Sequence, residues 1–196
     1  MKNTNPGLWS MGYGEVGATL KALEDCGITA EHFKAIRADK NLAEEISKFI
    51  ISKIIGDYNA VIDYDLSLAE MIAVGKYEWT NSEITAERFP VKGKGQVNIN
   101  FTVKHFARSI STETALKELD EQGLRPATIE ELLAFGVKYP NEQRKYPIVA
   151  LGSVGLNSHG HRVVAFLSED DSKRRLFLYY GGSGWVGCYR FLAVGK

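Results

Sequence analysis

The chain has 196 residues, of which 44% are hydrophobic and 24% charged, and this composition excludes a long disordered or collagen-like protein. Its 24 basic residues balance 24 acidic ones, so the whole molecule has no net attraction for nucleic acid or an anionic membrane. The longest apolar run, 49–55, is interrupted by Ser52 and Lys53 and is too short to cross a bilayer. Residues 1–7 lack a signal-peptide-like apolar stretch, so we expect a cytoplasmic protein in which Cys26 and Cys188 are reduced thiols.

Residues 1–56 predict a small helical module. Apolar residues recur at helical spacing from Ser10 to Leu23, and Gly27 ends this pattern. Thr29 is a candidate N-cap of a second helix, and Asp39 of a third. Inward-facing positions are expected on the second helix at Phe33 and Ile36, and on the third at Leu42, Ala43, Ile46, Phe49, Ile50 and Ile54, before Gly56 ends it.

Residues 57–94 are interpreted as a connecting segment. Leu66 to Val74 has a helical pattern, and Gly75 interrupts it. Aromatic residues are then scattered among polar ones up to Pro90, which indicates that the segment packs them on a neighbouring domain. The sequence Lys-Gly-Lys-Gly at 92–95 is typical of a flexible joint.

From residue 95 to 196 the pattern predicts an α+β domain. Residues 97–105 alternate between apolar and polar side chains, as in a half-buried strand. Helices are expected over 111–122 and 128–135, the second opening with a capping box at Thr128 and Glu131. The segment 125–127 between them is extended because the residue before a proline avoids the helical conformation. Short strands are expected at 148–151, 163–167, 175–180 and 189–194, separated by turn-rich segments.

The sequence carries few residues in a catalytic or metal-binding pattern. His159 and His161 flank a glycine, a spacing at which two imidazoles can share an ion, but no third ligand is near them in sequence, so two solvated histidines are expected. Motifs for a nucleophile elbow, a phosphate-binding loop, a zinc protease and a dinucleotide site are all missing. We therefore expect a protein that is not an enzyme and that has no cofactor or metal.

The segment 176–189 stands out because tyrosine, glycine and serine dominate it, with one tryptophan. Recognition loops favour this composition, since tyrosine and tryptophan offer a large contact area at small entropic cost while glycine and serine let the backbone adapt. Trp185 is also a candidate for the core of a β domain. The candidate ligand-binding residues are Phe177, Tyr179, Tyr180, Ser183, Trp185, Val186, Cys188 and Tyr189.

Two stretches of the chain resemble a known family. The run Gly-Leu-Arg-Pro-Ala-Thr-Ile-Glu-Glu-Leu at 123–132 resembles the helix entry R-L-P-T-x-x-E-W of C-type-lectin-fold domains of the formylglycine-generating-enzyme kind. Gly-Gly-Ser-Gly-Trp at 181–185, followed by the last strand, is similar to their closing G-G-S-W and G-F-R segment. Variable proteins of diversity-generating retroelements use this fold, with hypervariable residues just before the last strand.

The resemblance implies a bacterial or phage C-type-lectin-like domain over 95–196 that binds a ligand, with a protein as the expected partner and neither a membrane nor nucleic acid. The chain departs from the enzymes of that family, since Leu132 replaces the aromatic residue and their paired cysteines have no counterpart. Two other hypotheses stay open. One is an enzyme that uses His159 or His161 as acid or base; the other is a DNA-associated regulator whose N-terminal helices form a helix-turn-helix with Lys34, Arg37 and Lys40 near the turn.

Overall fold

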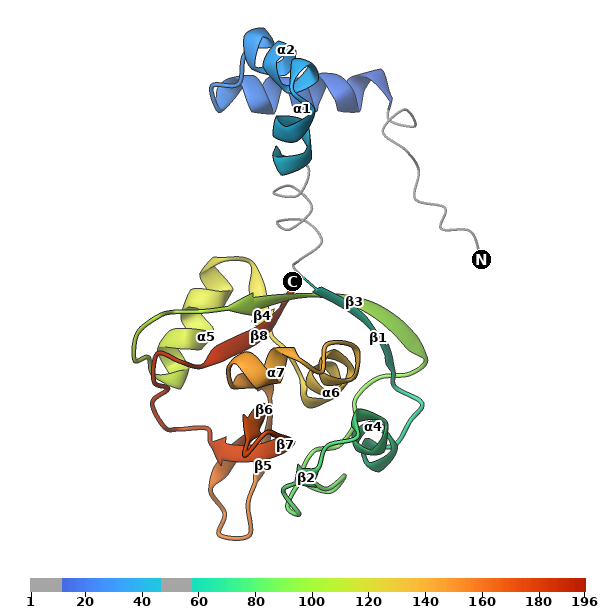
Figure 1. Ribbon diagram of the computed structural model, residues 1–196, viewed down its shortest axis with the longest axis vertical. Helices are drawn as coiled ribbons and strands as arrows, with labels where there is room; N and C mark the ends of the chain where they lie inside the picture. Colours follow the sequence, from blue (N-terminus) through green and yellow to red (C-terminus); the bar gives the residue numbers. More distant parts are fainter. Residues whose placement is uncertain (1–11, 47–57) are drawn as a thin grey trace. The chain divides into compact units, whose positions relative to one another are not determined.

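The computed structural model describes residues 12–46 and 58–196, and the chain divides into two compact units, Met1–Ile50 and Ile51–Lys196. The first unit contains the expected helices α1 (Tyr13–Asp25) and α2 (Ala30–Ala38), followed by a helical segment over 40–46 (Figure 1). Asp39 caps this segment, because its Oδ1 accepts the N–H groups of Asn41 and Leu42 at 2.9 and 3.2 Å.

The helices of the first unit bury little apolar surface. Phe33 and Ile36 on α2 are only half-buried, and no residue of α2 is fully buried. Val16 and Leu20 on α1 are exposed. The rest of the predicted apolar stripe, Phe49, Ile50 and Ile54, and the expected stop at Gly56 lie outside the described residues.

The second unit is an α+β structure built on one mixed sheet (Figure 1). Its described strands follow the order β1-β3-β8-β5-β6-β7-β2, and β4 pairs with β8 in addition. The strands are β1 (Tyr58–Asp63), β2 (Trp79–Thr80), β3 (Gln96–Lys104), β4 (Leu124–Pro126), β5 (Ile148–Leu156), β6 (Arg162–Asp170), β7 (Lys173–Tyr180) and β8 (Arg190–Gly195). The helices are α4 (Leu68–Gly75), α5 (Thr112–Glu121), α6 (Ile129–Lys138) and α7 (Glu142–Lys145).

Residues 58–94 belong to the same unit as this sheet and contribute two of its strands, which corrects the interpretation of segment 57–94 as a connection between domains. β1 pairs antiparallel with β3 over all six of its residues, and β2 pairs parallel with β7. Ile62 on β1 and Leu68 on α4 are buried in the main core. Lys92 and Gly95, expected in a flexible joint, donate their N–H groups to Glu130 and Asp65 of the same unit. Residues 58–95 are therefore an integral part of the second unit.

Side chains of the central strand β6 alternate between two hydrophobic cores. Val163, Ala165 and Leu167 face the main core beneath α4 and α6, whereas Val164 and Phe166 face a smaller core. The smaller core also contains Ala115 of α5 and Trp185. Because successive strand residues point to opposite faces, a strand buried on both faces reads as a continuous apolar run. The sequence Val-Val-Ala-Phe-Leu at 163–167 is such a run.

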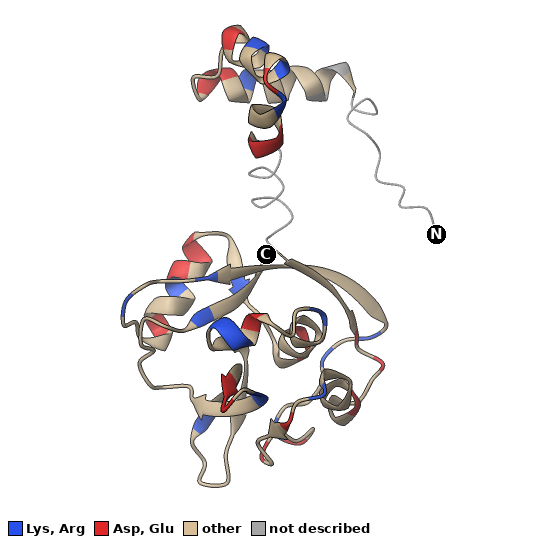
Figure 2. Ribbon diagram, viewed as in Figure 1, with Lys and Arg blue, Asp and Glu red and all other residues tan. Residues whose placement is uncertain are grey.

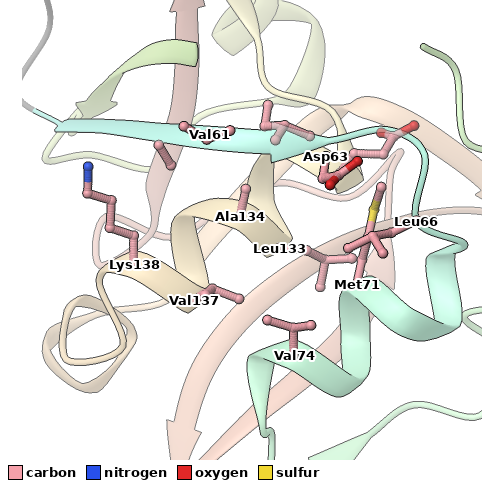
Figure 3. A pocket seen from close by; sticks show the side chains of 12 residues that line it. Val61, Asp63, Leu66, Met71, Val74, Leu133, Ala134, Val137 and Lys138 are labelled. Carbon is pink, nitrogen blue, oxygen red and sulfur yellow. The ribbon is translucent and has the colours of Figure 1, made fainter. Parts of the chain in front are cut away.

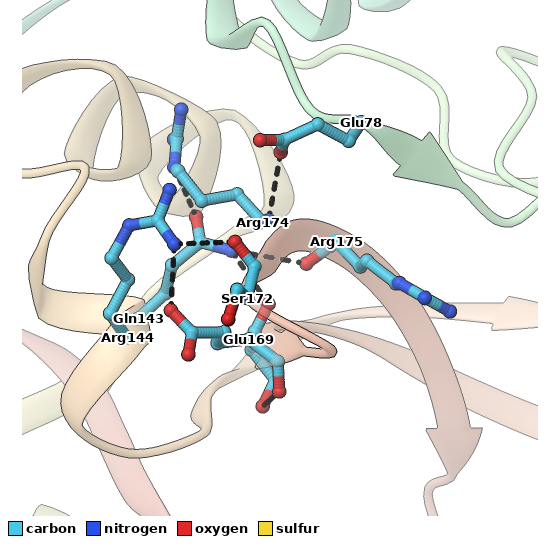
Figure 4. A network of polar contacts seen from close by, with 8 residues as sticks. Glu78, Gln143, Arg144, Glu169, Ser172, Arg174 and Arg175 are labelled. Atoms are coloured by element: carbon cyan, nitrogen blue, oxygen red, sulfur yellow. Dashed lines mark hydrogen bonds and ion pairs between the residues drawn. The ribbon is translucent and has the colours of Figure 1, made fainter.

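A buried arginine joins the helices to the sheet. Arg174 on β7 is 9% exposed, and its guanidinium donates to the carbonyls of Gly75 at 2.9 Å and Gly136 at 2.8 Å. Its Nε donates to Oε1 of Gln143 at 3.2 Å, and Figure 4 shows this contact. The two carbonyls lie in the last turns of α4 and α6, where the helix dipole favours a cation. Arg174 therefore holds two helix ends against β7.

A second polar cluster surrounds Glu142 at the start of α7. Its carboxylate accepts hydroxyl hydrogens from Tyr58 at 3.1 Å and Tyr146 at 2.8 Å, and it pairs with Lys145 at 2.7 Å. Burial works to raise the pKa of Glu142, but the hydrogen bonds from Lys145, Tyr146 and Tyr58 together outweigh burial and hold the pKa below its ordinary value. The cluster ties β1 to the chain that leads into β5.

Candidate functional site

The loop between β7 and β8 is anchored at Trp185. The main chain of Trp185 exchanges two hydrogen bonds with Ile110, at 2.8 and 2.9 Å. The indole Nε1 donates to the Thr112 hydroxyl at 2.8 Å, and Trp185 is only 1% exposed. Trp185 is thus a core residue that fixes the loop onto the start of α5, and its assignment as a ligand-contacting residue was wrong.

The register of β7 places the neighbouring residues Tyr179 and Tyr180 on opposite faces of the sheet. Tyr179 lies opposite Val164, whose side chain is in the smaller core, whereas Tyr180 lies opposite Val163, which faces the main core. This divergence follows from the period of two in a strand. The two rings nevertheless lie 6.4 Å apart, so both tyrosines remain close to one another at this end of the strand.

One group of them forms a shared surface, which we call the tyrosine patch and define as Tyr179, Val186 and Tyr189. The Tyr179 ring lies 5.3 Å from Trp185 and 6.2 Å from Tyr189, and Trp185 lies 5.1 Å from Tyr189. Tyr179 is 37% exposed and Val186 57%, while Tyr189 is half-buried. The Val186 carbonyl accepts the Tyr189 N–H at 3.1 Å, so a tight turn joins these two members.

The tyrosine patch is electrically neutral. Burial raises the pKa of the Tyr189 phenol, and the nearby Tyr179 and Cys188 raise it further, so the phenol stays protonated at neutral pH. The guanidinium of Arg190, next in sequence, lies 4.6 Å from the Tyr146 ring centroid and donates to the Cys188 carbonyl. The patch thus offers aromatic and aliphatic surface with phenol hydroxyls as its polar groups.

The other predicted contact residues lie around this patch or away from it. Phe177 is half-buried between Phe166 and Trp79, at centroid distances of 5.0 and 5.2 Å, so it supports the sheet surface beneath the patch. Ser183 is half-buried, and its carbonyl accepts the Thr112 hydroxyl at 3.4 Å. Cys188 is exposed, and so is Cys26 in the first unit; both are free thiols.

Tyr180 links the tyrosine patch to two histidines, because its ring lies 6.4 Å from that of Tyr179. The Tyr180 ring lies 5.6 Å from His161, which stacks at 6.4 Å on His159. Among the described residues no carboxylate hydrogen-bonds to either imidazole, and the only side-chain contact of either ring through nitrogen is Ser158 Oγ to His159 Nδ1 at 3.3 Å. Within the same described part of the chain, no group of three or more His, Cys, Asp and Glu is arranged to hold a metal ion.

The basic residues of the first unit lie among acidic ones (Figure 2). Lys34 pairs with Glu31 at 2.7 Å, and Lys40 lies 4.0 Å from Glu44. A helix-turn-helix needs a basic surface that is free to neutralise phosphates. These ion pairs reduce the positive charge that the first unit presents beside Arg37.

Sequence reasoning missed a groove beside β1. A cavity of about 410 Å³ lies between β1, α4 and α6. The strand beside it, Tyr-Asn-Ala-Val-Ile-Asp at 58–63, alternates in burial but not in polarity, and it pairs with β3, more than thirty residues later in the chain. Such a pairing is not visible in local periodicity.

Among the described residues, no helix has both the length and the apolar character that crossing a bilayer requires. Comparisons of the chain with family models, with curated proteins and with solved structures found no match.

Proposed function

We propose that residues 95–196 form a C-type-lectin-like domain whose tyrosine patch binds a protein partner without catalysing a reaction. The order of the elements supports the topology. The long strand β3 pairs antiparallel with the last strand β8, and α5 and α6 follow β3. The antiparallel strands β5, β6 and β7 come next, and β5 lies parallel to β8. Strand β1 adds a further edge to this arrangement.

The helix entry that resembles the family is built around an ion pair. Arg125 donates from two nitrogens to both carboxylate oxygens of Glu131, at 2.9 and 2.6 Å. Glu131 is 1% exposed and also accepts the Thr128 N–H at 2.7 Å, which completes the capping box. A bidentate pair of this kind fixes geometry as well as charge. The residues of the resemblance therefore have a structural role that fits the proposal.

The single observation that carries the function is the exposed Tyr179 ring, supported on its inner side by the buried Trp185. A rigid aromatic side chain that is already immobilised loses little entropy when a partner covers it. Tyrosine and tryptophan dominate the residues that contribute most binding free energy in protein interfaces. A neutral aromatic patch suits a protein surface better than it suits a phosphate or a metal ion.

The role of a variable protein adds a second expectation to this proposal. If the chain diversifies its recognition surface, substitutions between sibling strains should gather at the exposed positions Tyr179, Tyr180, Val186 and Cys188. Trp185, which lies between two of them in the sequence, should stay unchanged because it is buried. Sequencing the gene in sibling strains measures this, and an even spread of substitutions through 176–196 would contradict the variable role.

Site-specific photo-crosslinking in the source cells tests the binding function. The photoreactive residue p-benzoylphenylalanine replaces Tyr179 in one variant and Val97 in a control, since these residues are 37% and 38% exposed. We expect a discrete adduct only from position 179, and we expect Val186→Asp in the same chain to abolish it. Equal adducts from both positions, no adduct, or an adduct that survives Val186→Asp would refute the proposal.

A further inference from the structure

The groove beside β1 has an apolar floor. It measures about 410 Å³ and is lined by Leu66, Met71, Val74, Leu133, Ala134 and Val137. Figure 3 shows side chains of α4 and α6 facing each other below β1. Val74 and Val137 are both exposed, so the groove opens to solvent. The groove thus combines a strand with an apolar surface formed by two helices.

The strand wall of the groove presents unpaired main-chain groups. Among the described residues β1 pairs only with β3, at the end of the sheet. The Asn59 N–H donates to the Tyr139 hydroxyl at 3.0 Å, and its carbonyl accepts from that hydroxyl at 2.9 Å, whereas the Tyr64 N–H donates to Gly95 on the β3 side. Main-chain groups of successive strand residues point alternately to the two edges. The N–H and carbonyl of Val61 therefore point away from β3, toward the open edge.

The helix wall of the groove is one continuous face of α6. Glu130, Leu133, Ala134, Val137 and Lys138 all line it, at spacings of three, four, seven and eight residues from the first. Eight helical residues span about 12 Å, and the four strand steps from Asn59 to Asp63 span about 13 Å. Both walls therefore have the length of about five residues of extended chain.

The two ends of the groove carry opposite charges. Lys138 lies at one end, where its ammonium contacts Asn59 Oδ1, and Asp63 lies at the other (Figure 3). Glu130, eight residues before Lys138 on α6, lines the acidic end. Within the described part of the chain, none of these three side chains forms an ion pair.

Glu130 gives a further reason to expect a cation at the acidic end. It is 3% exposed, and its Oε1 accepts the Lys92 N–H at 2.9 Å. Its Oε2 is buried and has no hydrogen-bond partner among the described residues. A buried carboxylate oxygen without a donor is costly. A positively charged group bound at this end would lower that cost.

We propose that the groove binds an extended segment of a partner protein, which adds to the sheet as a strand antiparallel to β1. The segment places two apolar side chains against the floor, opposite Ala60 and Ile62, whose own side chains are buried. It carries a basic residue near Asp63 and Glu130 and an acidic residue near Lys138. Read from its N-terminus, a segment antiparallel to β1 passes Asp63 first and Lys138 last, so its sequence is Lys-Φ-Thr-Φ-Glu, where Φ is an apolar residue. Main-chain hydrogen bonds and alternate side-chain pockets are how strand addition combines affinity with specificity.

Binding is tested with a fluorescein-labelled peptide that contains Lys-Leu-Thr-Val-Glu and the full chain, by fluorescence polarisation. We expect saturable binding, and a loss of at least about tenfold in affinity for Val137→Arg, because the guanidinium occupies the apolar floor. Val137 is 40% exposed, so this variant should still fold. Val154→Arg, at a valine on β5 that is 43% exposed and does not line the groove, is the matched control and should bind as the wild type does. A peptide with serine at both apolar positions should not bind.

Charge and main-chain pairing provide two readouts that a nonspecific apolar contact would not give. Lys138→Glu should weaken binding of the Lys-Leu-Thr-Val-Glu peptide. A second peptide, in which lysine replaces the glutamate, should bind the Lys138→Glu variant with restored affinity. Hydrogen exchange should be fast at the Val61 amide in the free chain and slow in the complex. No saturable binding, binding that survives Val137→Arg, failure of the charge exchange to restore affinity, or an unchanged Val61 amide would each overturn the proposal.

Discussion

Replacing Arg174 by methionine is the sharpest test of the polar contacts that join α4 and α6 to the sheet. Methionine preserves most of the apolar stem of the side chain. It leaves the carbonyls of Gly75 and Gly136 and the amide oxygen of Gln143 without the donors that the guanidinium supplies. The change therefore removes hydrogen bonds while leaving the packing volume similar.

The size of the effect follows from opposing contributions. Each buried acceptor that loses its donor costs about 1–3 kcal/mol, and a hydrogen bond to a charged donor is stronger than a neutral one. Two helix C-termini also lose a cation, at about 0.3–1 kcal/mol each. Burying the arginine charge carries a desolvation penalty on folding. Methionine does not have this penalty, which offsets part of the lost stability. We expect the free energy of unfolding to fall by about 3 kcal/mol in total.

Urea unfolding followed by tryptophan fluorescence measures this loss, since Trp79 and Trp185 both lie in the second unit. The transition midpoint should fall while the slope stays the same. Arg174→Lys should lose less stability, because it keeps the charge but not the planar fork of donors. Lys173→Met, at an exposed position next to it, should change stability by less than about 0.5 kcal/mol. Equal stability of Arg174→Met and the wild type would refute this reasoning.

Three further changes test other parts of the second unit. Gly152→Ala should lower stability by about 1–3 kcal/mol in thermal unfolding, because a Cβ there would lie 2.6 Å from a main-chain carbonyl oxygen. Gly182→Ala is the control and should be neutral, since a Cβ at that position would meet no atom within 4 Å. Thr112→Val should cost about 1–3 kcal/mol in urea unfolding by leaving the buried indole N–H unpaired, and Thr112→Ser should largely preserve stability. The pKa of Glu142 in the folded state lies below its ordinary value of 4.5. The ionised carboxylate therefore stabilises the fold at pH values above 4.5, and this stabilisation is lost as the pH falls through the lowered pKa. In unfolding at a series of pH values, Glu142→Gln should therefore lose less stability than the wild type on acidification.

Local periodicity predicted most of the second half of the chain. The alternation at 97–105 corresponds to β3, and the capping box at Thr128 opens α6 as expected. The predicted strands at 148–151, 163–167, 175–180 and 189–194 are all present, but β5 continues to Leu156 and β6 to Asp170, into segments that were expected to be turn-rich. These elements were predictable because their signals lie within the segments themselves.

Nonlocal pairing limited the rest of the prediction. β1 is held as a strand by its pairing with β3, and β2 by its pairing with β7. Both partners lie far along the chain, so the sequence of segment 57–94 showed no strong strand pattern of its own. Arg174 lies in a run of charges that is typical of a solvated turn, yet helix ends far away in the sequence bury it. The ring contact between Tyr179 and Tyr180 is not what the alternation of side chains along a strand predicts. The burial of Trp185 depends on Thr112, seventy-three residues earlier.

The most direct test of the binding function is the affinity of the full chain for the partner that photo-crosslinking identifies. Isothermal calorimetry compares the wild type with a Tyr179→Ser, Val186→Asp double variant, and with Val97→Ser as the control. Loss of a central aromatic contact and burial of an unpaired charge should each cost about 2 kcal/mol or more, so the double variant should bind at least about a hundredfold more weakly. Wild-type affinity in the double variant would contradict the account.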